Sequence, residues 1–251
     1  MAKSGASEIK AGAAYVEIGA DDAKLRTGLR GAKAAMSRFS SDIARLGRGM
    51  MAAGAAALAP MVLAIKKAGD YQEILSKFKA VFKEHSAQAE AWSRDFSKSI
   101  GRARVDILSY MAAMQDTFVP LGFARDKAMD LAKAVTTLAV DMASFNNAAD
   151  EEVLRGLQSA LVGNHETVRR YGVIITQATL NQELLNMSIA DGVKKATNQQ
   201  KVMARLNIIM KGTTDAQGDA ARTAGSYANQ MKRLHASVSN LLVTLGEHFI
   251  P

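Results

Sequence analysis

Apolar residues recur along this chain at alternating spacings of four and three positions, the heptad period of paired α-helices. The pattern occurs in four segments. Their apolar positions are Leu25, Leu29, Ala32, Met36, Phe39, Ile43, Leu46, Met50, Ala53 and Ala57; Tyr71, Leu75, Phe78, Phe82, His85, Ala89, Trp92 and Phe96; Ala128, Leu131, Val135, Leu138, Met142 and Phe145; and Tyr227, Met231, Leu234, Val238, Leu241 and Leu245. Each segment is therefore predicted to form a helix whose apolar stripe packs against a partner helix.

Turn-forming residues separate the periodic segments and indicate where helices end. These breaks are Gly101, Val119–Gly122, Asn146-Asn147, Gly163-Asn164, Gly172, Asp191-Gly192 and Gly212. Helices of roughly 15–35 residues fit between them. A short amphipathic helix is expected at 153–161 and one or two turns at 165–171, followed by Val173–Thr176, whose β-branched side chains favour extended backbone.

The predicted fold is all-α: an elongated helical bundle with coiled-coil segments and a small compact helical region around 147–215. Four regions are expected along the chain. Residues 1–14 form a flexible leader, 15–100 form long heptad helices with an Ala/Gly-rich apolar segment, 101–215 form a helical core, and 216–251 form a C-terminal heptad helix. Only three prolines occur in 251 residues, so long helices are permitted almost everywhere.

Charge distinguishes the N-terminal part, although the chain as a whole carries only +8. Nine basic residues and one acid lie between Ala23 and Lys67. Met50–Ile65 is uncharged, and the basic residues that flank it are Arg45, Arg48, Lys66 and Lys67. These four are candidate contacts to a membrane or another polyanion, or they form a solubilising helix face. The uncharged segment is shorter than the roughly 20 residues that span a bilayer, which leaves a buried inter-helix segment and a membrane-active one as alternatives.

Recognisable catalytic and ligand-binding patterns are missing from the sequence. Gly47-Arg48-Gly49 lacks the further glycine and lysine of a phosphate-binding loop. The four histidines are scattered without metal-ligand spacing, no serine lies in a Gly-x-Ser-x-Gly elbow, and there is no cysteine. We therefore expect no catalytic residue, cofactor or metal, and a protein that works by packing against other polypeptides.

The segment Leu157–Ile175 resembles the "AL-x-G-x-x-E-x-L-x-x-x-G-I" block of bacteriophage tail tape measure proteins, with valines at two of its apolar positions. Ala59-Pro60 followed by Ala68–Tyr71 resembles the N-terminal helices of that family. The later positions Gly218-Asp219, Thr223, Ala228-Asn229, Leu245–Glu247 and Pro251 resemble its "G-D…T…A-N…LG…P" ending. The motif residues are Gly163, Glu166, Gly172, Gly218, Asp219, Asn229 and Gly246.

The resemblance implies a helical scaffold and ruler around which tail tube subunits polymerise, and which leaves the tail ahead of the DNA during genome ejection. It implies a homo-oligomer, a trimer or higher, that contacts the tail tube protein, tail assembly chaperones and tail tip proteins, as well as the host inner membrane and phage DNA. The implied locations are the virion tail lumen and, during assembly, the host bacterial cytoplasm. Members of the family usually continue for hundreds of residues, so the ruler proper is expected beyond Pro251. The alternatives are a membrane-active helical protein of the pore-forming type and a nucleic-acid-binding coiled coil.

Overall fold

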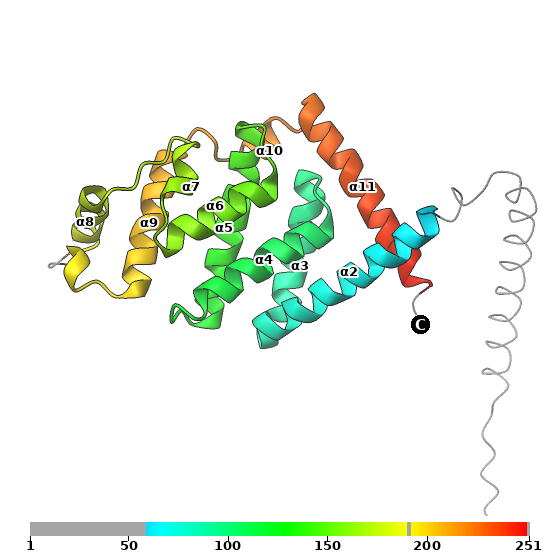
Figure 1. Ribbon diagram of the computed structural model, residues 1–251, viewed down its shortest axis with the longest axis horizontal. Helices are drawn as coiled ribbons and strands as arrows, with labels where there is room; N and C mark the ends of the chain where they lie inside the picture. The colour runs from blue at the N-terminus through cyan, green and yellow to red at the C-terminus, as the bar shows by residue number, and fades with distance from the viewer. Residues whose placement is uncertain (1–58, 190–191, 250–251) are drawn as a thin grey trace, which may run out of the picture. The chain divides into compact units, whose positions relative to one another are not determined.

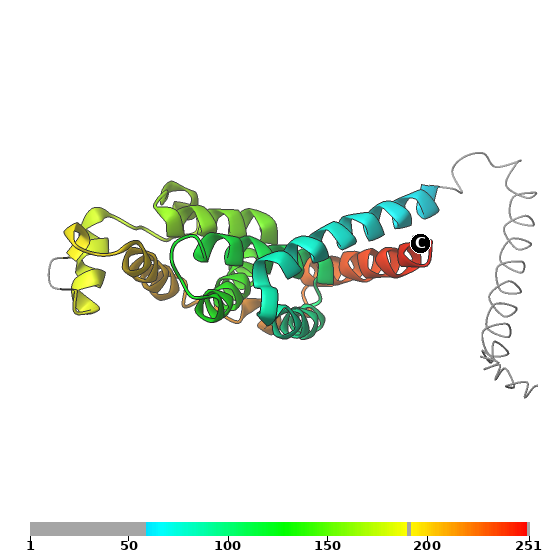
Figure 2. The same ribbon diagram turned by 90° about the horizontal axis from the view of Figure 1, so that it is seen from below.

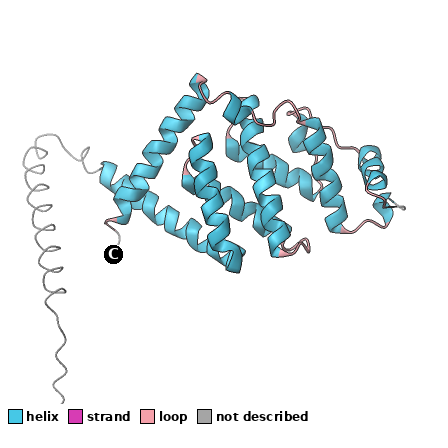
Figure 3. Cartoon of the chain, turned by 180° about the vertical axis from the view of Figure 1, so that it is seen from behind, coloured by secondary structure: helices cyan, strands magenta, loops and turns pink. Residues whose placement is uncertain are grey.

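The computed structural model describes residues 59–189 and 192–249, and within these ranges the chain consists of helices, turns and loops without a β-strand. The fold is therefore all-α, as the sequence predicts (Figure 3). The first predicted heptad segment, from Leu25 to Ala57, lies outside the described residues, and so do Arg45 and Arg48.

The described helices follow one another through short connections (Figure 1). In chain order they are α2 (Ala59–Phe82), the 3₁₀ turn η2 (Lys83–His85), α3 (Ser86–Ile100), α4 (Arg104–Phe118), α5 (Arg125–Phe145), α6 (Asp150–Val162), α7 (Glu166–Arg169), α8 (Gln177–Asn186), the 3₁₀ turn η3 (Gly192–Lys194), α9 (Asn198–Gly212), α10 (Asp219–Arg222) and α11 (Tyr227–Glu247). The predicted breaks at Gly101, 119–122, Asn146-Asn147 and Gly163 all fall between helices.

One hydrophobic core joins α2–α7 with α9, α10 and α11. Its largest fully buried side chains include Phe78 and Phe82 of α2 and Phe118 of α4. A smaller cluster lies between α8 and α9 and consists of Leu180, Leu184, Ala196 and Ala204. The main core thus draws on all three regions that the sequence separates at residues 100 and 215, and the chain from Ala59 onward forms one compact unit.

The predicted continuous stripe from Tyr71 to Phe96 is divided between two helices. Lys83 adopts a positive φ of 50°, and the chain turns there through η2, so that α2 and α3 both pack against α4. Phe78 and Phe82 remain in the core on one side of the turn, with ring centroids 4.4 Å apart. Trp92 and Phe96 stack on the other side at 4.7 Å and are half-buried. The 4,3 spacing continues across the turn because both helices place apolar residues on the same core.

The segment Val173–Thr176 forms no strand. Val173 and Ile175 are buried in the main core, and Thr176 has an extended backbone and caps α8. Its side chain accepts a hydrogen bond from the backbone of Thr179, whose hydroxyl in turn accepts one from the backbone of Thr176. The β-branched residues therefore serve as a helix lead-in and core anchor.

The longest described helix, α2, has 24 residues. Of the helices in residues 59–189 and 192–249, none has both the length and the apolar character required to cross a membrane. The greater part of the uncharged segment Met50–Ile65 precedes the described range. Extended coiled-coil pairing stays a prediction.

Candidate functional site

Helix α11 carries two heptad stripes on nearly opposite faces. One stripe is buried against the rest of the fold and includes Asn229, Ala236, Ser239, Val243 and Gly246. The other consists of the large apolar residues predicted from the sequence. At about 100° per residue, the centres of the two stripes lie about 150° apart around the helix. The helix therefore docks through small and polar residues and turns its larger apolar residues outward.

The C-terminal half of α11 lies against the first half of α2 (Figures 1 and 2). Gly246 makes this approach possible, since a Cβ atom there would overlap the carbonyl oxygen of Ala64 and lie 2.7 Å from the Cβ of Ala68. Ala64 and Ala68 are themselves buried. Backbone thus packs against backbone, an arrangement that requires glycine and alanine at the crossing.

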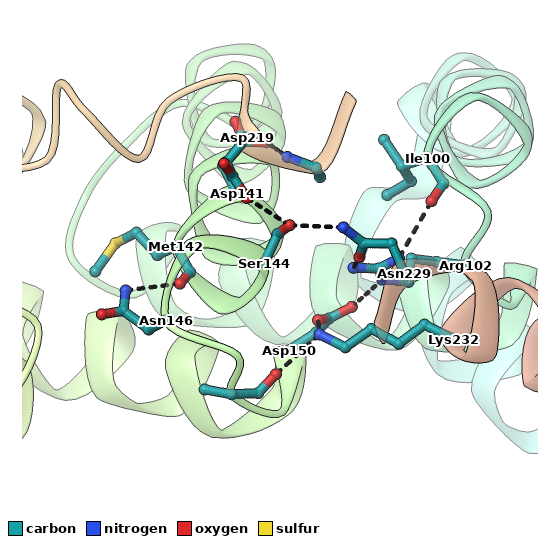
Figure 4. Close-up of polar contacts among 12 residues, drawn as sticks. Ile100, Arg102, Asp141, Met142, Ser144, Asn146, Asp150, Asp219, Asn229 and Lys232 are labelled. Atoms are coloured by element: carbon teal, nitrogen blue, oxygen red, sulfur yellow. Dashed lines mark hydrogen bonds and ion pairs between the residues drawn. The ribbon is translucent and has the colours of Figure 1, made fainter. Parts of the chain in front are cut away.

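The N-terminal end of α11 is held by a network of polar side chains centred on Asn229 (Figure 4). Asn229 is 6% exposed, and its Nδ2 donates to the hydroxyls of Ser144 and Thr223, each at 2.9 Å. Its Oδ1 accepts a hydrogen bond from Arg102 at 3.2 Å. The Ser226 hydroxyl caps the helix by accepting from the Asn229 backbone N–H. One side chain thus joins α5, the α3–α4 connection and the residues before α11.

Arg102 extends the network into a buried ion cluster. Its Nε donates to Asp150 at 2.5 Å, and Lys232 of α11 donates to the other oxygen of the same carboxylate at 2.9 Å. The side chains of Arg102 and Asp150 are only 5% and 8% exposed. Arg102 also donates to the Ile100 carbonyl, and Lys232 to that of Ala148. Because removing one member would leave a buried charge without its partner, this cluster strongly fixes α11 relative to the start of α6.

Asp141 and Asp219 complete the network on the α10 side. Asp141, on α5, accepts hydrogen bonds from the backbone N–H groups of Gly218 and Ala220 at 2.8 and 3.2 Å. Burial raises the pKa of the Asp141 carboxyl, and these two donors oppose that rise. Asp219 accepts from Ser144 at 2.7 Å. Gly218 has a φ of 76°, the left-handed conformation that glycine adopts most readily.

We call this set of side chains the Asn229 network. It consists of Arg102, Asp141, Ser144, Asp150, Asp219, Thr223, Asn229 and Lys232. Six side-chain atoms of the described residues are buried without a hydrogen-bond partner, and none of them belongs to this network. An arrangement that satisfies its own polar atoms is suited to holding helices together.

The structure brings together part of the predicted motif set. Gly218, Asp219 and Asn229 meet in or beside the Asn229 network, and Gly246 lies at the other end of α11. The remaining motif residues lie in α7 and in the turns on either side of it. Gly163 follows α6 with a φ of 120°, Glu166 pairs with Arg169 at 3.2 Å in α7, and Gly172 has a φ of 80°.

Five of the eight network residues were not among those singled out from the sequence. Arg102, Asp141, Ser144, Asp150 and Lys232 come from four stretches of chain and pair across as many as 127 positions. The one local signal is Asp141, a carboxylate between the apolar residues Val140 and Met142 on a helix with a buried face. A charge at such a position indicates a buried partner without saying which one.

The predicted interface residues fall into three groups. Tyr71, Phe78, Phe82, Val135, Leu138 and Met142 are buried, and Leu75 and Leu131 are half-buried. Leu234, Val238 and Leu241 are exposed. Leu25, Leu29, Met36, Phe39, Ile43 and Leu46 lie outside the described residues, as stated above. The candidate polyanion contacts Lys66 and Lys67 lie on α2, the first exposed and the second half-buried.

The exposed group belongs to a continuous surface that we call the α11 stripe. It consists of Tyr227, Met231, Leu234, Val238, Leu241 and Leu245, whose side chains are between 46% and 82% exposed. Fully burying one large apolar side chain contributes about 1.5–3 kcal/mol. Six that are about half exposed or more therefore leave several kcal/mol of burial unrealised within the described part of the chain.

In the described part of the chain, no group of three or more His, Asp or Glu side chains is placed to hold a metal ion. Comparison of the whole chain with protein-family models, curated proteins and solved structures gives no match. The site is therefore interpreted from its own geometry: an internally satisfied network that docks α11, and an apolar stripe that α11 presents outward.

Proposed function

We propose that this chain is a phage or prophage tail tape measure protein, or the N-terminal conserved part of one, acting as a scaffold in tail assembly. In this role it binds other polypeptides through helix faces and catalyses no reaction. Its partners are further copies of itself, the tail tube protein, tail assembly chaperones and tail tip proteins. It occupies the lumen of the assembled tail, is released during genome ejection, and then meets the host inner membrane and the phage DNA.

The observation that carries the proposal is the meeting of motif residues that are far apart in the sequence. Gly218, Asp219 and Asn229 were identified by their resemblance to the family ending, and all three take part in seating α11. Gly246, from the same ending, seats the other end of that helix. Residues whose spacing resembles a family pattern thus share one structural task, which supports regarding the pattern as a unit.

The α11 stripe adds support for a scaffold. A protein that functions alone gains by burying its large apolar residues, whereas an assembly protein needs them on a surface. Helix α11 instead docks through small and polar residues such as Asn229, Ala236 and Gly246.

Within a tape measure protein, the described residues suit an anchoring role. An α-helix extends 1.5 Å per residue, so a ruler needs long uninterrupted helices. Residues 147–249 instead contain α6–α11, several of which are short and packed onto one core. Shortening this region therefore removes core contacts. We expect such a deletion to unfold the protein rather than to shorten the tail.

In-frame deletions in the parent phage gene test this assignment. Deletions within 147–251 are expected to abolish tail assembly, because they remove the Asn229 network and α11 from the core. Tail lengths measured by electron microscopy report the result, with the unaltered gene supplied in trans as the control. Normal tails that are shorter in proportion to the deletion would show that this region is the ruler. Normal tails of unchanged length would contradict the proposed function.

A further inference from the structure

We propose that the α11 stripe is a self-association surface that pairs with α11 of a second copy of this chain. The stripe runs from Tyr227 to Leu245, a rise of about 27 Å along the helix axis. The pairing names a partner for the scaffold proposed above and to that extent rests on the proposed function. The contact itself follows from the geometry of α11.

The spacing of the stripe specifies another helix as the occupant. Its six residues alternate strictly at four and three positions, which matches the a and d positions of a heptad. A globular ligand or an extended peptide requires no such repeat. A second α11 has the same repeat and the same length because it has the same sequence. The resulting interface is isologous, with the same patch contributed by both copies.

The positions that flank the stripe favour a like partner. Heptads that select a different chain usually carry charges at e and g, where complementary pairs form across the interface. In α11 these positions are Ala228, His235, Leu242, Gln230, Ser237 and Thr244, with no lysine, arginine, aspartate or glutamate among them. At these flanking positions, two identical copies therefore meet without repulsion between lysine, arginine or carboxylate side chains. A partner with complementary charges is not required there.

Each copy also leaves room for the other. The face of α11 that contacts its own fold, including Ala236 and Val243, lies about 150° around the helix from the stripe, at about 100° per residue. Leu234, Val238 and Leu241 are 56%, 49% and 57% exposed, so the described elements leave about half of each residue open to a partner. Two paired α11 helices would thus carry their respective cores on outer faces.

Sedimentation equilibrium of the full chain tests the pairing. We expect the unaltered chain to show at least twice the single-chain mass at micromolar concentration. The double substitution Leu234→Asp with Leu241→Asp places two carboxylates in the interface of each copy and should weaken association at least tenfold. Ser99→Asp adds a carboxylate at an exposed position of α3, away from the stripe, and Leu234→Met keeps the stripe apolar. Both of these control variants should stay within about threefold of the original, because the apolar contacts remain.

Two further measurements separate a lost interface from a lost fold or a different interface. Below the association midpoint, the thermal midpoint of the double variant should stay within about 3 °C of the original, since the stripe is outside the core. Phe39→Asp, in the first heptad segment, serves as the comparison. Association that survives the α11 double substitution but is lost with Phe39→Asp would place self-association elsewhere and overturn the proposal.

A single introduced cysteine reports the contact directly, because the chain has none of its own. Maleimide labelling of Val238→Cys should slow at least fivefold when the protein concentration rises above the association midpoint, because the thiol becomes covered. Ser99→Cys, exposed on α3, should label at a constant rate. The pairing would be overturned if the labelling rate of Val238→Cys did not depend on protein concentration. It would also be overturned if the original chain stayed monomeric at about 100 μM. Either result would leave the tail-assembly role to be decided by the deletion experiment.

Discussion

Asn229 links three parts of the molecule because it uses both ends of its amide. The donor end satisfies Ser144 and Thr223, and the acceptor end satisfies Arg102. Few other side chains could do both, since aspartate lacks the donors and serine lacks the reach. This explains why an asparagine occupies a buried position on α11 where a helix of a bundle normally places an apolar residue.

We expect Asn229→Ala to destabilise the fold by about 1–3 kcal/mol, because the partners of the amide would be left buried and unsatisfied. The free energy of unfolding from urea titration measures the effect. Asn164→Ala is the matched control, since Asn164 is exposed and is expected to change stability by less than about 0.5 kcal/mol. Equal effects of the two substitutions would show that the Asn229 network contributes nothing to docking α11.

At the scale of helices, α11 illustrates what hydrophobic spacing can and cannot predict. The sequence pattern identified the helix and its large apolar stripe, because both follow from local periodicity. It could not identify the docking face, since that face consists mainly of small and polar residues such as Ala236, Ser239 and Gly246. Their packing depends on α2, which lies far away in the sequence, and so no local pattern reveals it.

The same distinction explains the other helix boundaries. The α3–α4 and α6–α7 connections were predicted because Gly101 and Gly163 adopt positive φ values that glycine tolerates best. The division between α2 and α3 was missed because Lys83 also has a positive φ, of 50°, without being glycine or asparagine. A left-handed lysine is unfavourable locally. It persists here because the helices on both sides pack into the core.

The crossing of α2 and α11 gives a prediction with an internal control. Gly246→Ala should destabilise the fold by about 1–3 kcal/mol, because the added methyl group meets the backbone of α2 and neither helix can shift without repacking. Gly225→Ala should be tolerated, since nothing lies within 4 Å of a Cβ atom there. Thermal unfolding of both variants measures the difference. A tolerated Gly246→Ala would mean that the two helices are further apart than described.

At the scale of the whole molecule, the described chain from Ala59 onward combines a hydrophobic core with a surface that includes an exposed apolar stripe. The core joins elements from all three regions that the sequence separates. The surface includes a helix that holds its place through a buried polar network and close backbone contact. This division leaves the α11 stripe free for another polypeptide. A helical unit with its own core that also presents an apolar face suits the scaffold role proposed above.

The protein content of purified tails tests the tail-assembly role most directly. Quantitative mass spectrometry of DNA-filled particles and of particles that have ejected their DNA compares the two states, with the tail tube protein as the internal standard. We predict that peptides from this chain occur in filled particles at several copies per tail and are lost from emptied ones, while the tube protein is unchanged. Absence of the chain from filled tails would contradict the account.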